Sequence, residues 1–281
     1  MIENRKGLKV LAHLTIIVTL LMVCFPIYIA IIASTQSAEA VVTAPLSLLP
    51  GDHFWENYQT ALWGSGKTAT ISAGRMLWVS LVMTFIIAIG KIAISITSAF
   101  AIVYFRFPGR MILFWIIFIT LMLPVEVRII PTFDVVANLH LLNSYAGLTI
   151  PLIASATATF LFRQFYSTVP DELLEAARVD GAGAMRFFKD ILLPLSRPTI
   201  AALFVIQFIY GWNQYLWPLL MTTREEMFSI SVGLRQMMGS GDALVDWNIV
   251  MATTVLMLIP PMIIILIMQK WLVKGLIDSE K

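Results

Sequence analysis

The residues best suited to binding a partner gather in one charged segment, residues 167–198, of an otherwise apolar chain. This charged loop contains the run Glu175–Gly181 and, beginning ten residues later, the run Ile191–Pro194. Charged side chains are costly inside a membrane, so such a segment needs water or another protein around it. Its acids, bases and fixed bend favour docking onto another protein. An amphipathic hairpin lying on the lipid surface is the alternative.

The charged loop is predicted to form two short helices with a sharp bend between them. Thr168 is suited to cap the first helix, whose first turn would hold residues that favour a helix start: Pro170, Asp171 and Glu172. This helix is expected to run to about Asp180, after which Gly181 supplies the turn. A second helix over residues 185–193 would present Phe187, Phe188 and Ile191 at helical spacing until Pro194 ends it.

A second set of candidates consists of polar and ionisable side chains within apolar runs. Lys91 lies midway along one run, and Arg128 lies near the end of another, next to Glu126. Ionisable groups inside a membrane are functional candidates, here for lining a substrate path. Lys91 could instead bond to a partner helix, and Arg128 could pair with Glu126. Four residues of a later run are a third candidate group, with bonding between helices as the alternative role: Asn213, Gln214, Tyr215 and Trp217.

The elements that must position these residues are membrane-spanning helices. Hydrophobic residues make up 59% of the chain and charged residues 13%, against about 25% charged in soluble domains. Six apolar runs are each long enough to cross a bilayer, which takes about 20 residues. Their approximate ranges are 11–33, 76–104, 111–130, 146–165, 199–220 and 249–271. The predicted fold is therefore an all-α membrane protein of six spans, a single domain over residues 1–281, with the charged loop between the fourth and fifth spans.

The distribution of basic residues predicts the orientation. If the amino terminus is cytoplasmic, the inner segments carry thirteen of the 19 lysines and arginines, whereas the outer segments carry five. Because basic residues accumulate on the cytoplasmic side, both termini and the charged loop are expected in the cytoplasm. The net charge of +2 gives no indication of nucleic-acid binding.

The sequence indicates no catalytic or metal centre. The run Gly64–Thr68 resembles the end of a phosphate-binding loop, but Ala61 stands where the full pattern needs glycine, and no apolar strand leads into it. The three histidines lie on different segments, and the single cysteine, Cys24, lies in the first apolar run. We therefore expect a non-catalytic subunit that binds no metal or cofactor itself.

The spacing within the charged loop resembles one specific motif. Residues 175–194 match the pattern E-A-A, three residues, G, nine residues, I-x-L-P at every position. This is the EAA loop of the permease subunits of binding-protein-dependent ABC importers. In that family the loop is a coupling helix that docks on a cytoplasmic ATPase subunit. The resemblance therefore implies a set of ATPase-coupling residues: Glu175, Ala176, Ala177, Asp180, Gly181, Met185, Phe187, Phe188, Ile191 and Pro194.

Other blocks are similar to a narrower group within the maltose-type, six-span subfamily. The runs 98–103, 105–108, 118–128, 145–149, 154–165, 211–219 and 274–281 resemble the second permease subunit of sn-glycerol-3-phosphate importers. This resemblance implies a bacterial inner-membrane complex with a second, different permease subunit, two ATPase subunits that use ATP and Mg²⁺, and a periplasmic substrate-binding protein. An anionic cargo of this kind would need cations along its path, for which Lys91 and Arg128 qualify.

Two alternatives stay open. The first keeps the same machine and changes the cargo to a neutral sugar or another polyol. The second is an ion-coupled secondary transporter, which has no ATPase partner. Recovery of nucleotide-binding subunits with the chain would separate these classes.

Overall fold

The computed structural model describes residues 6–64, 72–120, 125–239 and 245–277, and not the side chains of residues 6–8, 125–126 and 272–277. The described part is helical and contains no β-strand, which confirms the predicted all-α class. Two sequence features lie outside it: most of the glycine-rich run 64–68, and the side chain of Glu126.

Three helices are long and apolar enough to cross a membrane by themselves. These are α1 (Lys6–Ala33), α4 (Ala73–Tyr104) and α15 (Trp247–Ile277), and they correspond to the first, second and sixth predicted runs. Helix α1 is little covered by the rest of the chain, since 11% of its apolar window is buried, and Cys24 is exposed on it. Apolar helices of this kind need lipid or another helix around them.

The other predicted runs are interrupted. The run 146–165 consists of α7 (Tyr145–Thr149), a 3₁₀ turn (Ile150–Leu152) and α8 (Ala156–Tyr166), with a bend of 47° between its halves. The second half starts afresh because the Ser155 hydroxyl accepts a hydrogen bond from the Ala158 N–H, at 3.3 Å.

The remaining two runs are divided as well. The run 199–220 consists of α12 (Arg197–Trp212) and α13 (Leu216–Met221), separated because the ring of Pro218 would clash with a carbonyl one turn earlier in a continuous helix. The run 111–130 covers α5 (Arg110–Ile119), residues outside the described part, and the start of α6 (Val125–Asn138). The number of membrane crossings stays a prediction.

The chain divides into two compact units. The first contains residues 1–77 and 233–259, and the second contains residues 78–232 and 260–281. Helices α4, α14 (Ile230–Met237) and α15 each contribute residues to both. The first unit also holds two short helices that follow α1, α2 (Ala38–Val42) and α3 (Phe54–Trp63).

A buried asparagine organises the first unit. The Asn57 side-chain amide donates hydrogen bonds to the carbonyl oxygens of Ser34 and Gln36, at 2.9 and 2.8 Å. Its Oδ1 atom accepts a hydrogen bond from Asn248 Nδ2, at 2.8 Å. All four residues are buried, so this network satisfies polar groups that would otherwise be costly. It joins the end of α1, helix α3 and the start of α15.

Replacement of Asn57 by leucine is therefore expected to destabilise the first unit by about 2–4 kcal/mol, because each buried polar group left unpaired costs about 1–3 kcal/mol. The midpoint of thermal unfolding in detergent measures the effect. Tyr58→Phe is a matched control, since it removes one hydrogen bond, between Tyr58 Oη and Ser34 Oγ at 3.0 Å. Equal small shifts for both variants would contradict the importance of this network.

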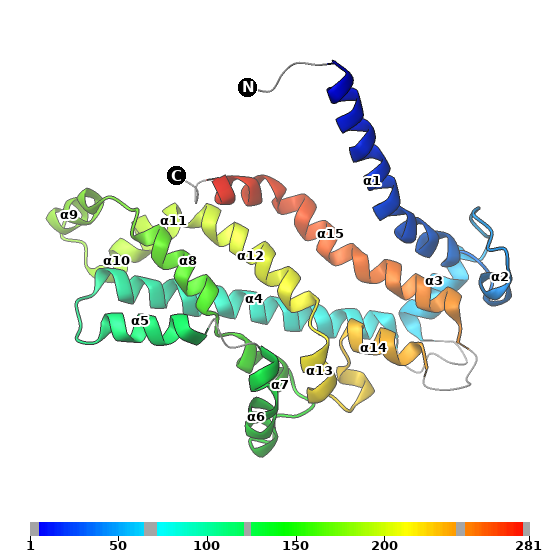
Figure 1. The fold of residues 1–281 in the computed structure, drawn as a ribbon. Helices are drawn as coiled ribbons and strands as arrows, with labels where there is room; N and C mark the ends of the chain where they lie inside the picture. Colours follow the sequence, from blue (N-terminus) through cyan, green and yellow to red (C-terminus); the bar gives the residue numbers. More distant parts are fainter. Residues whose placement is uncertain (1–5, 65–71, 121–124, 240–244, 278–281) are drawn as a thin grey trace. The chain divides into compact units, whose positions relative to one another are not determined.

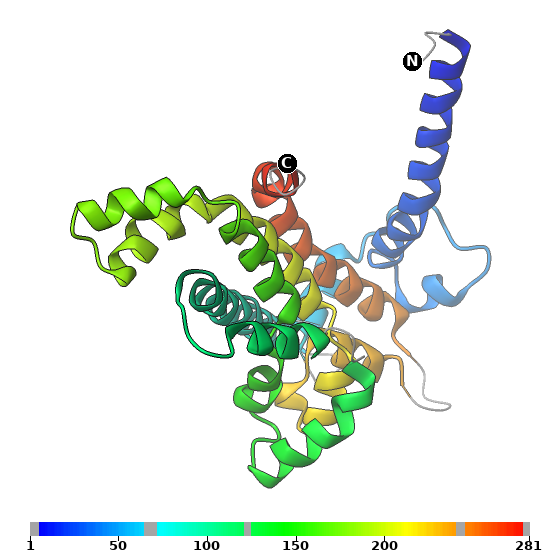
Figure 2. The same cartoon turned by 60° about the vertical axis from the view of Figure 1, so that its left-hand side comes forward.

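Two hydrophobic cores lie among the described residues of the second unit. One lies where α13 contacts α6 and α7, and it includes Leu148, Trp217 and Met221. The other joins α4, α8 and α12 to the charged loop, and it includes Phe100, Phe162 and Leu203. Figure 1 shows α9 (Asp171–Val179) and α10 (Ala184–Phe187) of that loop projecting near the carboxyl end of α4, and Figure 2 shows the same projection from a second direction. The charged loop thus extends from a packed end of this unit.

Candidate functional site

The first half of the charged loop forms helix α9 (Asp171–Val179), close to the predicted bounds. Asp171 and Glu172 occupy its first turn, as expected, where their charges interact favourably with the helix dipole. The prediction that Thr168 caps this helix was wrong, because Pro170 occupies the N-cap position. The Thr168 hydroxyl instead donates to the carbonyl of Phe165, at 2.7 Å, and so belongs to the end of α8.

The bend after α9 is a Schellman motif. The Ala182 N–H donates to the Ala177 carbonyl at 2.8 Å, and the Gly181 N–H donates to the Arg178 carbonyl at 3.0 Å. Gly181 has φ +71°, in the left-handed region that favours glycine. The predicted turn at this residue is confirmed. Because its backbone hydrogen bonds are satisfied, the bend has a defined shape.

The second half of the loop is longer than predicted. Helix α10 (Ala184–Phe187) continues through a π-helical turn (Phe188–Leu192) into α11 (Leu193–Leu195). Pro194 therefore does not end the helix, as the sequence predicted. It lies in the short α11, which ends one residue later at Leu195. The sharp change of direction, 70°, lies instead between Leu195 and Arg197, where the buried Ser196 hydroxyl donates to the Leu192 carbonyl at 2.6 Å.

The ten predicted coupling residues divide into two groups by exposure. Glu175, Ala176, Asp180, Gly181, Met185 and Pro194 are exposed, whereas Ala177, Phe187 and Phe188 are buried within the chain and Ile191 is half-buried. A buried aromatic side chain cannot contact a partner directly without leaving its core. The exposed group is therefore accessible to a partner, whereas the buried group packs within the chain.

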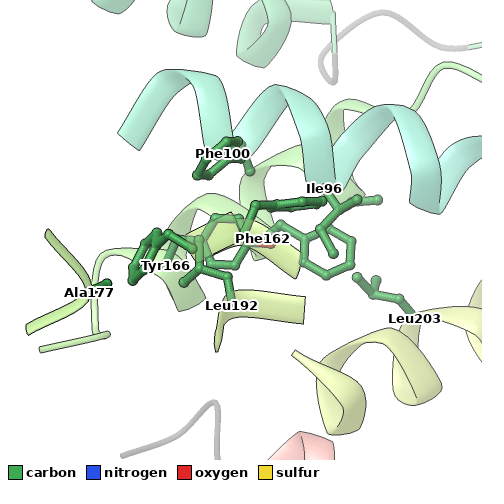
Figure 3. Packing of buried hydrophobic residues seen from close by; sticks show 11 residues of the cluster. Ile96, Phe100, Phe162, Tyr166, Ala177, Leu192 and Leu203 are labelled. Carbon is green, nitrogen blue, oxygen red and sulfur yellow. The ribbon is translucent and has the colours of Figure 1, made fainter. Parts of the chain in front are cut away.

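An aromatic core connects the charged loop to the spans. Phe187 is 2% exposed, and its ring centroid lies 5.3 Å from that of Tyr104. Phe188 is 8% exposed, and its ring centroid lies 4.8 Å from that of Phe100. Figure 3 shows Phe162 and Tyr166 of α8 gathered between Phe100 of α4 and Leu192 of the π-helical turn. Close packing of this kind transmits movement, because protein interiors have low compressibility. The end of α10 and the π-helical turn are therefore packed directly against α4 and α8.

The candidate cations Lys91 and Arg128 have different environments. Lys91 is 6% exposed, and its Nζ atom lies 3.5 Å from the ring centroid of Tyr210 on α12. Arg128 is exposed on α6. The predicted partner of Arg128, Glu126, has no described side chain, so that pairing stays a prediction.

The polar residues around the end of α12 have different environments. Trp217 is buried, and its Nε1 atom donates to the Gly147 carbonyl at 3.3 Å, which fits a bond between elements rather than a path-lining role. Gln214 donates to the Tyr210 carbonyl at 3.2 Å. Asn213 and Tyr215 are exposed, in the break between α12 and α13. The exposed members remain candidates for a path.

Metal binding finds no support within the described part, where no group of three or more histidine, cysteine or acidic side chains is arranged to hold an ion.

Comparison with known proteins identifies the family. The model of the family described as "binding-protein-dependent transport system inner membrane component" matches residues 91–278, which include Lys91, Arg128 and the charged loop. The chain belongs to this family. It is therefore the permease, the membrane component of a transport system, and it works with other subunits.

Three relatives match the permease over its full length. Proteins from Yersinia pestis bv. Antiqua, Agrobacterium fabrum and Brucella melitensis biotype 1 are 58%, 56% and 55% identical to it, each with 100% of both chains covered. All three are named sn-glycerol-3-phosphate transport system permease protein UgpE. A crystal structure of a bacterial ABC transporter involved in the import of the acidic polysaccharide alginate has a chain with the same fold, with TM-score 0.83 and 22% identity over 96% of the permease and 98% of that chain.

The sequence pattern did not single out two residues of interest, Val179 and Tyr210. Val179 ends α9 and is 87% exposed, beside Asp180 and Gly181. An apolar residue among charged neighbours was its only signal. Tyr210 was missed because its contact with Lys91 joins two distant helices, and no local pattern announces such a contact.

Proposed function

We propose that the permease is one of two different permease subunits of an ATP-driven importer of sn-glycerol-3-phosphate. The observation that carries this proposal is the full-length identity of 58% to a protein named as a permease of that transport system. Identity at this level over both chains extends to the spans as well as to the charged loop.

The proposed complex contains a second permease, two ATPase subunits and a periplasmic protein that delivers the cargo. ATP and Mg²⁺ belong to the ATPase subunits, and the permease itself carries out no catalysis. The excess of basic residues in the inner segments supports an orientation in the inner membrane with both termini and the charged loop in the cytoplasm. There the exposed residues of α9 and α10 would meet an ATPase subunit.

The packing of the charged loop supports its role as a lever. Docking on α9 and α10 would be passed through Phe187 and Phe188 to α4 and α8, because these rings are buried among them. Closure of the ATPase pair would then reorient the spans between inward-open and outward-open states. Membership of a binding-protein-dependent family argues against the ion-coupled alternative.

Purification and uptake together test the proposal. The permease is co-expressed with its neighbouring subunits and purified in detergent. Two ATPase subunits and a second permease are expected to co-purify with it. The complex in liposomes, supplied with binding protein, is expected to accumulate radiolabelled sn-glycerol-3-phosphate in an ATP-dependent way. Purification of the permease without any ATPase subunit would refute the proposal of an ATP-driven importer. Uptake of a neutral sugar in place of the phosphate ester would show that the cargo is a sugar.

The exposed apolar tip of α9 gives a specific prediction. Val179→Ser is expected to leave thermal stability within about 0.5 kcal/mol, because surface substitutions rarely do more. It is expected to weaken binding of the ATPase subunit about tenfold, as loss of an apolar anchor at an interface does. Titration of the solubilised permease with ATPase subunit measures the change. Unchanged affinity for the ATPase subunit would show that Val179 is not part of the docking surface.

A further inference from the structure

A loop in the first unit exposes apolar side chains beside the end of a membrane-spanning helix. This apolar loop, residues 42–50, begins at the last residue of α2 and leads towards α3, and it contains no charged residue. Val42, Leu48 and Leu49 are 64%, 52% and 73% exposed. Exposed apolar surface without charges marks a contact with lipid or with another protein. The role proposed for the charged loop does not account for this surface.

Hydrogen bonds hold the apolar loop against α1. The Tyr28 hydroxyl donates to the Leu48 carbonyl at 2.6 Å, and Gln36 Nε2 donates to the Leu49 carbonyl at 2.7 Å. Tyr28 lies five residues before Ala33, the last residue of α1, which corresponds to about 7.5 Å along a helix axis. The loop therefore folds back along α1, and Figure 2 shows it beside the end of that helix.

This geometry places the apolar loop at the level of the membrane. The apolar window of α1 that is long enough to cross a bilayer extends to Ala33, so Tyr28 lies inside the span. Tyr28 and Ile31 are also exposed, and the loop therefore continues the apolar surface of that span. After the loop, the Gly51 N–H donates to Thr35 Oγ1 at 2.8 Å, so the chain has returned there to a level beyond the end of α1.

Hydrogen bonds within the chain also satisfy polar groups of the apolar loop, as an apolar environment requires. Two of its carbonyl groups are bonded to side chains near the end of α1. The Thr43 hydroxyl donates to the Glu39 carbonyl at 2.7 Å, and the Leu49 N–H donates to Ser47 Oγ at 3.2 Å. Two further residues of the loop are prolines, which have no N–H to satisfy. A loop of this kind suits the boundary between lipid headgroups and acyl chains, where water is scarce.

We propose that the apolar loop is a membrane anchor, whose Leu48 and Leu49 side chains insert at the boundary between headgroups and acyl chains. Apolar side chains of interfacial segments reach about 5–10 Å into this boundary. In the proposed orientation the leaflet concerned is the outer one. The Asn57 network joins the end of α1 to α3 and to the start of α15, so the anchor would set the membrane depth of that junction. This inference concerns the lipid bilayer and does not depend on the cargo or on the ATPase subunits.

Quenching of fluorescence by spin-labelled lipids tests the anchor. Cys24→Ala removes the single native thiol, and Leu49→Cys in that background can carry an environment-sensitive maleimide dye. The Leu49 side chain is exposed and its bonded atoms belong to the backbone, so the substitution should leave the fold unchanged. In phosphatidylcholine liposomes we expect a blue shift of the dye emission. We also expect a loss of intensity that is larger with spin labels near the headgroup than with spin labels near the end of the acyl chain.

Asp52→Cys, labelled in the same way, is the matched control. Asp52 is exposed and follows Gly51, which is bonded beyond the end of α1. Its dye should be quenched by iodide in the water and unaffected by the lipid spin labels. Equal lipid quenching at both positions, or none at position 49, would overturn the anchor. Loss of the lipid quenching on assembly with the other subunits would overturn it as well, because another protein would then cover the loop.

Discussion

Substitution of Glu175 by lysine is expected to abolish uptake while the permease stays folded and inserted. Glu175 is exposed on α9, in the same short helix as the Val179 tip. Reversal of a charge at an interface turns attraction into repulsion, so binding of the ATPase subunit should weaken by about a hundredfold or more. Uptake in liposomes and titration with the ATPase subunit measure the two effects.

Glu175→Gln is the matched control, because it keeps the shape and hydrogen-bonding reach of the side chain and removes only the charge. It should give an intermediate defect. Thermal unfolding of both variants should resemble that of the unaltered permease, since an exposed side chain contributes little to stability. Normal uptake by Glu175→Lys would contradict the docking role of the charged loop.

Replacement of Phe187 by alanine should separate ATP hydrolysis from transport. Its ring is 2% exposed and packs against Tyr104, so the substitution leaves a cavity between the charged loop and α4. Such changes cost about 3–5 kcal/mol. We expect the ATPase subunits still to bind, because the exposed residues of α9 are unchanged. Uptake per ATP hydrolysed should fall, because movement of the loop no longer reaches the spans.

Phe187→Leu provides the comparison, since it preserves most of the buried volume and should retain partial coupling. The ratio of uptake to ATP hydrolysis, measured on the same liposomes, decides the matter. A proportional fall of both activities in Phe187→Ala would indicate instability alone. It would contradict the proposed transmission of movement through Phe187.

The sequence predicted the parts of the charged loop that local rules determine. Asp171 and Glu172 favour a helix start in almost any context, and Gly181 favours a left-handed turn, and all three take their expected places. Thr168 and Pro194 were misjudged because each has two suitable positions, at the end of one element or the start of the next. Packing around α8 and the π-helical turn chooses between them.

The contacts between distant segments could not be predicted in this way. Periodicity indicated that Phe187 and Phe188 share a helix, but not that their rings lie inside the chain. Lys91 was recognisable as a charge in an apolar run, whereas its position on Tyr210 depends on how α4 packs against α12. The breaks at residues 153–155 and 213–215 likewise interrupt runs whose hydropathy is continuous.

The uncovered first helix also provides an experimental handle. Cys24, the single cysteine among 281 residues, is exposed on α1. A fluorescent maleimide or a nitroxide can therefore be attached at one defined point without removing any other thiol. Its spectrum, recorded for the isolated permease and again after assembly, would report whether lipid or a neighbouring subunit surrounds this helix.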